Sequence, residues 1–318
     1  MAHLLFSLQA TVPVFLLIVL GWVFRRIGLL SEAFCKISDR LVFQAALPVM
    51  LFCDMAATDF QQSFDLSYLL FCAAVTTIAF FSLWFLARRF VADRSLIGEF
   101  VQVSYRSSAA ILGVSIIRNI YGNAGMAPLM ILGSVPLFNI YAVLVLSMEG
   151  PRGREQSLGV LLRAALVNIA KNPIILGILL GLGASFCGFS SFPPILDRTL
   201  GSIAALATPL ALLSIGASFQ GRQALGHLRL SSAAASIKLL ILPLIFLPLA
   251  ITLGFTGQAL LALIIMLGSV STPTCYIMAK NLGHEGSLSV SVIVLTTMLS
   301  AFTLTGWIFL AGFLGYLT

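Results

Sequence analysis

Two short stretches of this apolar chain contain the residue types that could bind a ligand. Residues 107–113 read Ser-Ser-Ala-Ala-Ile-Leu-Gly, and residues 268–274 read Gly-Ser-Val-Ser-Thr-Pro-Thr. Pro273 lacks a backbone N–H and disfavours helical geometry at the residue before it, and Gly113 permits a break in a helix. A helix broken at such a point presents free N–H groups and a helix N-terminus, which carry partial positive charge and suit a carboxylate.

The candidate substrate-binding residues come from these two stretches, from the cation that precedes the first, and from one amide in a later apolar run. They are Arg106, Ser107, Ser108, Gly113, Asn139, Ser271, Thr272, Pro273 and Thr274. The alternative is that the small residues only let helices pack closely, and the two roles can coexist.

Arg106 is the most informative single residue, because it lies about 13 Å along a predicted helix from its cytoplasmic end. A charge at that depth is costly and usually faces a cavity or a partner. It would attract an anionic substrate, or supply a fixed charge where relatives bind a cation. The alternatives are a side chain that reaches the inner interface, or a structural pair with Glu99 or Asp54.

Three further polar residues lie in or beside apolar runs. Lys238 has a long flexible stem, so we predict that its ammonium extends to the membrane interface. Asn139 and Asn172 either make interhelical hydrogen bonds or line a central cavity, and both alternatives stay open.

The composition around these residues indicates that lipid is the solvent for most side chains. The 318 residues are 59% hydrophobic and 9% charged, whereas a soluble chain carries roughly a quarter charged residues. Backbone groups in lipid must be satisfied within each segment, so we predict an all-α polytopic membrane protein with ten transmembrane helices. The spans lie near residues 4–24, 37–56, 67–87, 97–118, 126–148, 166–186, 201–219, 231–253, 259–280 and 288–314.

Loop charges set the expected orientation. Fourteen basic residues fall in the loops on one side and only Arg118 and Arg198 on the other. The positive-inside rule makes the fourteen cytoplasmic, which places both termini of this multi-pass protein outside the cytoplasm of a bacterial inner membrane. The same loop placement accounts for the formal charge of +7, so we expect no nucleic-acid partner.

Five cysteines without C-x-x-C spacing and three scattered histidines give no metal set, and we expect no cofactor and no enzyme activity.

The two halves of the chain resemble each other. Pro13 and Pro48 are 35 residues apart, and Pro173 and Pro209 are 36 apart, in spans one and two of each half. The same shift places residues 107–113 on residues 268–274. We therefore predict one five-helix repeat over residues 1–150 and a second over 151–318. An odd number of helices per repeat inverts the second one, as in many secondary transporters, and the paired stretches become broken, crossing helices 4 and 9.

The ordered motifs resemble the auxin efflux carrier family over nearly the whole chain. They are Pro13-Val-Phe-Leu-Leu-Ile-Val-Leu-Gly21, Leu41-Val-Phe-Gln-Ala-Ala-Leu-Pro48, Tyr105-Arg-Ser-Ser-Ala-Ala-Ile-Leu-Gly113, Val135-Pro-Leu-Phe-Asn139, Lys171-Asn-Pro173, Ala207-Thr-Pro-Leu-Ala-Leu-Leu-Ser-Ile-Gly-Ala217, Ser271-Thr-Pro-Thr274 and Leu295-Thr-Thr-Met-Leu-Ser300. The resemblance implies the inverted-repeat fold shared with bile-acid symporters, and efflux or exchange of small organic anions such as malonate or malate by an elevator-type motion. Relatives commonly have Asn where this chain has Ser108.

The leading hypothesis is a secondary carrier of mono- or dicarboxylates. The alternatives are a transporter-like membrane sensor, which would need a soluble output domain, and a channel, whose flux would not saturate. Sodium or proton coupling finds no support, because the predicted core lacks a carboxylate pair. A homodimer is one assembly that the sequence leaves open.

Overall fold

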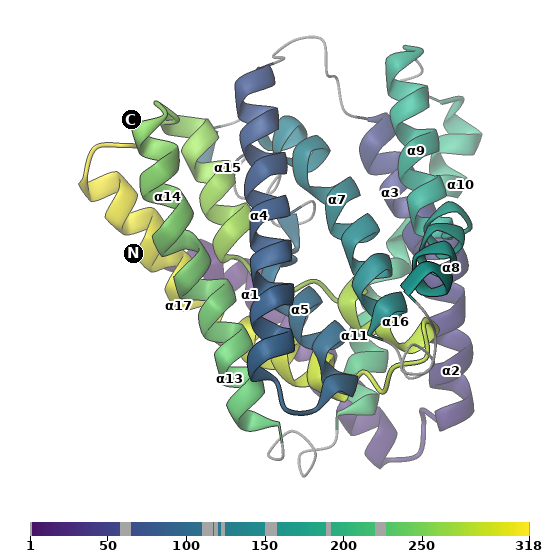
Figure 1. The fold of residues 1–318 in the computed structure, drawn as a ribbon. Coiled ribbons are helices and arrows are strands. Elements are labelled where there is room, and N and C mark those ends of the chain that lie inside the picture. The colour runs from purple at the N-terminus through teal and green to yellow at the C-terminus, as the bar shows by residue number, and fades with distance from the viewer. Residues whose placement is uncertain are drawn as a thin grey trace.

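The computed structural model describes residues 2–57, 65–109, 117, 120–121, 125–149, 158–188, 192–219 and 227–317. These residues form helices joined by turns, without a strand (Figure 1). The helices are α1 (Ala2–Arg26), α2 (Glu32–Leu41), α3 (Leu47–Ala56), α4 (Leu66–Phe90), α5 (Ile97–Tyr105), α7 (Ala127–Met148), α8 (Leu158–Ala170), α9 (Pro173–Phe186), α10 (Pro194–Ala205), α11 (Ala207–Ser218), α13 (Leu228–Ser236), α14 (Leu242–Thr252), α15 (Gly257–Gly268), α16 (Thr274–Asn281) and α17 (Ser287–Phe313), with a 3-10 turn η2 (Arg94–Leu96) and π-helical turns η1 (Val42–Ala46) and η5 (Ile237–Ile241).

Five described helical segments are long and apolar enough to cross a membrane, and a sixth results if a pair bent by 53° counts as one span. The five are Leu66–Phe90, Ala127–Met148, Pro194–Ser218, Leu228–Thr252 and Ser287–Phe313, and the bent pair is Arg163–Ala170 with Pro173–Phe186. They coincide with predicted spans three, five, seven, eight, ten and six. Together with the composition they define an integral, multi-pass membrane protein, while the full count of ten stays a prediction.

Polar side chains cap several helices. Ser31 accepts from the N–H of Phe34 at the start of α2, and Asp65 accepts from the N–H of Tyr68 at the start of α4. Asn172 accepts from the first two N–H groups of α9, at 2.9 and 3.3 Å. Such caps satisfy donors that a helix leaves free. The side-chain oxygen of Asn172 is thus used at the start of its own helix.

Two long helices contain a π-helical turn two residues before a proline. Turn η1 lies between α2 and α3 and precedes Pro48, and η5 lies between α13 and α14 and precedes Pro243. Proline removes one helix hydrogen bond and clashes with the preceding turn, so a wider turn at this point lets the helix continue.

One group of helices, which we call the panel, consists of α1–α3 and α9–α11. Within it α1 packs on α11 and α3 on α9, both through glycine. A Cβ atom at Gly21 would lie against the backbone carbonyl of Leu213, and one at Gly181 against that of Phe52. The absence of a side chain therefore allows the backbones to approach closely, as is common between membrane helices.

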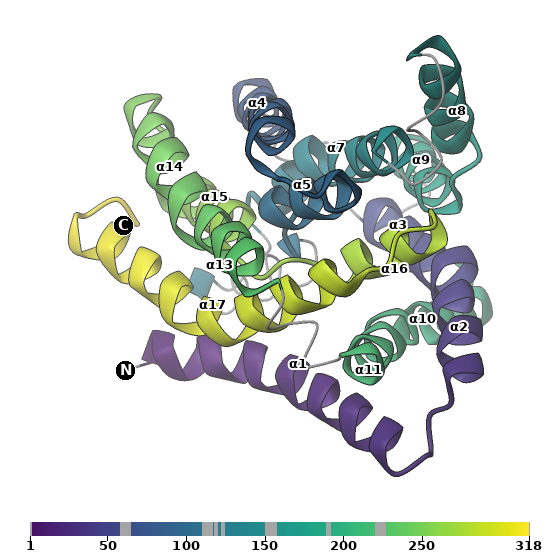
Figure 2. The ribbon, with the colours of Figure 1, turned by 60° about the horizontal axis from the view of Figure 1, so that its bottom comes forward.

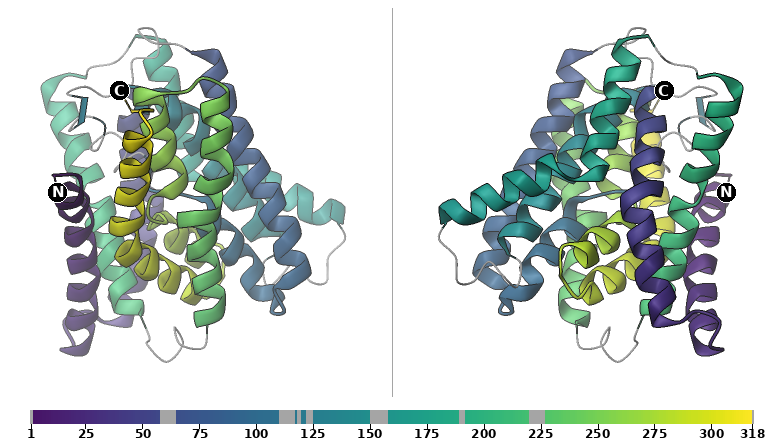
Figure 3. Two further views of the ribbon diagram at one scale, coloured as in Figure 1. Left: turned by 90° about the vertical axis from the view of Figure 1, so that its left-hand side faces the viewer. Right: turned by 90° about the vertical axis from the view of Figure 1, so that its right-hand side faces the viewer.

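The second group, which we call the bundle, consists of α4, α5, α7 and α13–α17 (Figures 1 and 3). Panel and bundle meet where α1 runs beside α17 and where α2 contacts α16 (Figure 2). The interior of the bundle contains α5 and α15, whose side chains are almost all buried.

Candidate functional site

Two helix ends meet inside the bundle. Helix α5 ends at Tyr105, after which Arg106 has extended backbone geometry, and α15 ends at Gly268, six residues before α16 begins at Thr274. The N–H of Ser108 donates to the carbonyl of Val270 over 3.0 Å. The interruption expected at Pro273 is thus present, and the residues that follow α5 lie directly against it. We call the residues that follow α5, together with those between α15 and α16, the crossing.

Side chains from both chain segments add hydrogen bonds across the crossing. The Ser271 hydroxyl donates to the Val103 carbonyl over 2.7 Å, and Gln102 Nε2 donates to the Cys275 carbonyl over 2.9 Å. All four residues are buried. The first bond satisfies a carbonyl that the end of α5 would otherwise leave without a donor, and the second joins α5 to the first turn of α16.

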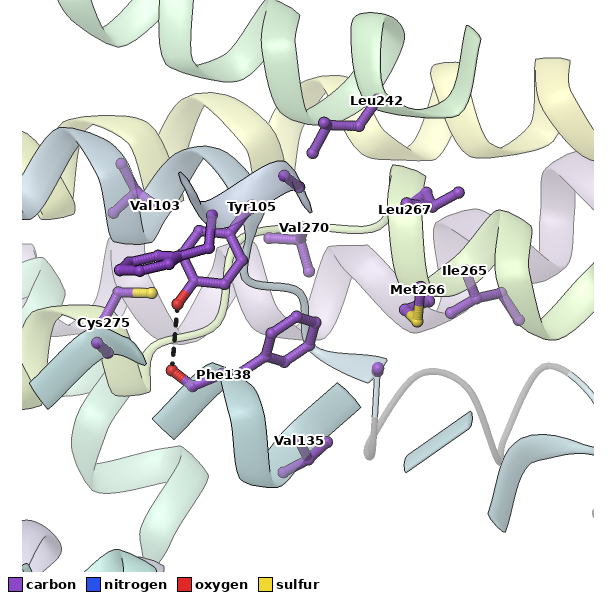
Figure 4. Close-up of a cluster of buried hydrophobic side chains, with 14 of the residues drawn as sticks. Val103, Tyr105, Val135, Phe138, Leu242, Ile265, Met266, Leu267, Val270 and Cys275 are labelled. Carbon is purple, nitrogen blue, oxygen red and sulfur yellow. Dashed lines mark hydrogen bonds between the residues drawn. The ribbon is translucent and has the colours of Figure 1, made fainter. Parts of the chain in front are cut away.

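Apolar side chains enclose the crossing (Figure 4). Tyr105 and Val270 lie close together, with Leu267 at the end of α15 on one side and Phe138 of α7 on the other. The Tyr105 hydroxyl donates to the Phe138 carbonyl over 3.3 Å, which attaches the end of α5 to α7. The site is therefore shielded from lipid by tightly packed side chains.

Arg106 is 2% exposed, so its guanidinium does not reach the membrane interface. It donates to three neutral acceptors, which are Asn139 Oδ1 at 3.1 Å, Gln102 Oε1 at 3.3 Å and Met278 Sδ at 3.1 Å. Its Nε has no hydrogen-bond partner among the residues placed in the structure. Two of the predicted site residues are thus in contact, because Asn139 on α7 accepts a hydrogen bond from Arg106.

The alternative in which Arg106 pairs with Glu99 does not hold. The Glu99 carboxylate accepts instead from the N–H of Gly286 and from the N–H and hydroxyl of Ser289, at 2.8 to 2.9 Å. Gly286 has a φ of 74°, which suits glycine and turns the chain into α17. A carboxylate is favoured at a helix N-terminus by free N–H groups and the helix dipole, so Glu99 caps α17.

The prediction that Lys238 reaches the interface is also wrong. Its side chain is fully buried, in η5, and Nζ donates to the carbonyls of Tyr105, Met266 and Leu267 at 3.2, 3.0 and 2.9 Å. These carbonyls are at the C-terminal ends of α5 and α15. A buried ammonium is stable only when its donors are all paired, and the two helix ends supply that pairing.

The remaining predicted residues surround the same point. The Thr272 hydroxyl donates to that of Thr274 over 3.2 Å at the start of α16, and Thr272 and Pro273 are partly exposed. Ser107 and Ser269 are buried, and neither hydroxyl has a partner within the described part of the chain. Gly113 lies outside the described residues. The other eight candidates are assembled at the crossing or bonded to a residue of it.

A cavity of about 610 Å³ lies where panel and bundle meet. It is formed by the end of α1, the start of α2, the end of α11, α16 and the start of α17, with the lining residues Trp22, Arg25, Arg26, Glu32, Cys35, Ala217, Ser218, Phe219, Tyr276, Lys280, Glu285, Gly286, Ser287 and Val290. Helix α16 connects the two places, because it begins at the crossing and contributes Tyr276 and Lys280 to the cavity wall.

The charged residues of the cavity come from the loops predicted to be cytoplasmic. They are three cations and two acids, of which Glu32 forms a 2.8 Å ion pair with Lys36. The Lys36 ammonium lowers the pKa of Glu32 below its ordinary value, so this acid stays charged and paired.

Sequence reasoning overlooked the polar residues that hold the crossing together. Gln102 contacts both the Cys275 carbonyl and Arg106, and the Tyr276 hydroxyl contacts Asp39 and Ser218 of the panel. The available signal was the occurrence of Gln102 and Asp39 inside predicted spans, where polar residues need partners.

Interrupted helices that meet inside a multi-pass membrane protein are typical of transporters. A family described as membrane transport protein, the auxin efflux carrier family, matches residues 6–308 of this chain. The chain therefore belongs to this family of membrane transporters.

Two curated relatives align with nearly the whole chain. One, named "Uncharacterized transporter", is from Methanothermobacter thermautotrophicus and is 23% identical over 308 residues, which are 95% of this chain and 97% of the relative. The other, named "Putative malonate transporter", is from Rhizobium meliloti and is 24% identical over 309 residues, which are 94% of this chain and 93% of the relative.

Proposed function

We propose that this protein is a secondary carrier that moves small organic anions, mono- or dicarboxylates, by alternating access. The observation that carries the proposal is that Arg106 and Lys238 are both buried at the crossing and bonded only to neutral acceptors among the described residues. The name of the Rhizobium meliloti relative points to a dicarboxylate of the same class.

Two buried positive charges produce a favourable potential for an anion, because the low dielectric of a membrane interior screens them weakly. Ser107 supplies a buried hydroxyl without a partner in the described part of the chain, and Thr272 and Thr274 add hydroxyls at the N-terminus of α16. A carboxylate there would accept hydrogen bonds and be stabilised by the helix dipole. We therefore assign substrate binding to these residues with Arg106, Ser108, Gly113, Asn139, Ser271 and Pro273.

The cavity supplies the route for access. It lies between panel and bundle, and α16 leads from its wall to the crossing. In the proposed elevator-type cycle the bundle carries the crossing along the panel, so that the cavity closes on one side of the membrane as an equivalent cavity opens on the other. Arg25, Arg26 and Lys280 would concentrate anions at the cavity mouth.

The glycine contacts of the panel support an inverted repeat. The shift of 160 residues that places Pro13 on Pro173 also places Gly21 on Gly181, and the shift of 161 that places Pro48 on Pro209 places Phe52 on Leu213. Gly21 packs on Leu213, and Gly181 packs on Phe52. The two contacts are therefore equivalent between a first repeat over 1–150 and a second over 151–318.

The basic loops favour an orientation with the cavity on the cytoplasmic side of an inner membrane and both termini on the other side. In this orientation the structure corresponds to an inward-facing state.

Uptake by proteoliposomes tests the proposal. Purified protein should take up radiolabelled malonate, malate or a monocarboxylate with saturation, and a counter-loaded substrate should accelerate uptake. Arg106→Gln should raise the KM for the transported acid about tenfold or more, since it removes a buried charge. Arg40→Gln, which removes an exposed cation, should leave the KM unchanged. Linear, unsaturated flux would favour a channel, and an unchanged KM in Arg106→Gln for every acid would remove Arg106 from the site.

A further inference from the structure

The ammonium of Lys238 occupies a place built from carbonyl oxygens of two different helices. Tyr105 belongs to the last turn of α5, and Met266 and Leu267 belong to the last turn of α15. The final carbonyls of a helix have no partner within the helix and carry its partial negative charge. Two such ends directed at one point form a site for a cation, independent of any side chain.

We infer that Lys238 is a tethered cation that fills a monovalent-cation site at the crossing, so that the carrier works without a free metal ion there. Carbonyls of unwound segments and C-terminal ends of half-helices are the groups that bind coupling ions in secondary transporters. Here the ligands are present, but a side chain of the protein supplies the positive charge. The coupling part of this inference rests on the proposed carrier function, whereas the cation site itself does not.

The fit between the ammonium and its surroundings supports this assignment. A lysine ammonium has three donors and no acceptor, and the three carbonyls use all three, at 2.9 to 3.2 Å. The side chain is fully buried and forms no ion pair with a described acid. The charge is therefore stabilised by the helix ends rather than by a counter-ion.

The backbone around Lys238 also favours this role. Lys238 lies in the π-helical turn η5, which widens the helix that faces α5 and α15. Helical turns of this type occur mostly as single insertions and often at functional sites. The long stem reaches the helix ends from a third element, so Lys238 also fixes α5, α15 and the helix from α13 to α14 relative to one another.

Removal of the tether should turn the site into one for a free ion. In Lys238→Ala the three carbonyls remain, the buried volume of the side chain is vacated, and a monovalent cation can enter. Lys238→Ser is a second variant, since its hydroxyl oxygen can serve as a further ligand. Lys36→Ala is the matched control, because Lys36 is exposed and, within the described residues, pairs with Glu32 alone.

The test is the thermal stability of the purified full-length proteins in chloride salts of sodium, potassium, ammonium or choline at equal ionic strength. A ligand that binds the folded state raises its Tm. We expect Lys238→Ala or Lys238→Ser to melt about 3 °C or more higher in at least one of the three small cations than in choline. Wild type and Lys36→Ala should melt at the same temperature in sodium as in choline.

Several outcomes would overturn the inference. They are a sodium-dependent Tm in wild type, folded Lys238 variants whose Tm is the same in all four salts, and Lys238 variants that cannot be purified in any of them. Variants that can be purified only with sodium, potassium or ammonium support it. No substrate enters this measurement, so its failure is distinguishable from failure of the carrier proposal. In proteoliposomes that transport, replacing sodium by choline should leave the wild-type rate unchanged.

Discussion

The hydroxyl of Tyr276 on α16 donates to Asp39 Oδ2 on α2 over 3.1 Å, across the boundary between bundle and panel. The same hydroxyl lies 2.7 Å from that of Ser218 on α11. Asp39 is buried, and its Oδ2 receives its hydrogen bond from the Tyr276 hydroxyl, which Ser218 contacts in turn. This cluster therefore fixes the bundle to the panel beside the cavity, in the state that the structure represents.

The first prediction concerns this cluster. Tyr276→Phe should lower the free energy of unfolding by about 1–3 kcal/mol, because it leaves a buried carboxylate oxygen without its donor. In a double-mutant cycle with Asp39→Asn, measured by thermal melting, the two changes should be coupled. Tyr316→Phe, at a hydroxyl with no recorded hydrogen bond in the described chain, should change the Tm little. Strictly additive effects would contradict the proposed contact.

The second prediction concerns Glu99, which accepts three hydrogen bonds at the start of α17 and is 1% exposed. Glu99→Gln replaces an acceptor by a donor and removes the negative charge at the helix N-terminus. We expect a loss of about 1–3 kcal/mol in stability, measured as a lower Tm. Glu32→Gln, at an exposed surface pair, should have almost no effect. If instead Glu99 served Arg106, the loss would disappear in an Arg106→Gln background.

The third prediction concerns the glycines of the panel. Gly181→Ala places a Cβ against the Phe52 carbonyl, and Gly21→Ala places one against that of Leu213. Helix backbones must then separate, which should cost about 1–3 kcal/mol of stability in each variant. Gly183→Ala is the control on the same helix, because nothing lies within 4 Å of its added Cβ. The measurement is the Tm of detergent-purified protein, and similar melting of Gly181→Ala and Gly183→Ala would contradict close packing at this interface.

Local signals in the sequence were sufficient for the break before α16. Pro273 removes a hydrogen bond and restricts Thr272 wherever it occurs, so an interruption at this point could be predicted without knowledge of its neighbours, although α15 already ends at Gly268. The end of α5 at Tyr105 comes two residues before the predicted stretch, because Ser108 is bonded to Val270, which is far away in sequence. Only the assembled fold determines that contact.

The surroundings of the buried charges could not be predicted for the same reason. Lys238 lies in an apolar run, and its long flexible stem suggested that its ammonium reaches the membrane interface. Its true partners could not be predicted, because they are backbone carbonyls, which every residue possesses. Which carbonyls are free and where two helix ends meet depends on tertiary packing. Glu99 was a plausible partner for Arg106 by sequence distance, but the N-terminus of α17 competes successfully for its carboxylate.

The fourth prediction concerns access to the cavity. Ala217 lies at the end of α11, lines the cavity and is partly exposed, whereas Val292 on α17 is fully buried. In a background with Cys35, Cys53 and Cys187 replaced by serine, Ala217→Cys should react with a membrane-impermeant maleimide. Val292→Cys should not react.

The modification rate of Ala217→Cys depends on the side of the membrane from which the maleimide is added. In the proposed orientation the cavity faces the cytoplasm, so Ala217→Cys should be modified several-fold faster in inside-out vesicles than in intact cells. A transported acid that shifts the bundle along the panel changes the population of the open cavity, and should therefore change the modification rate of Ala217→Cys. Faster modification from the outer side would reverse the assigned orientation. Equal modification of Ala217→Cys and Val292→Cys would show that the wall of the cavity is not the one described.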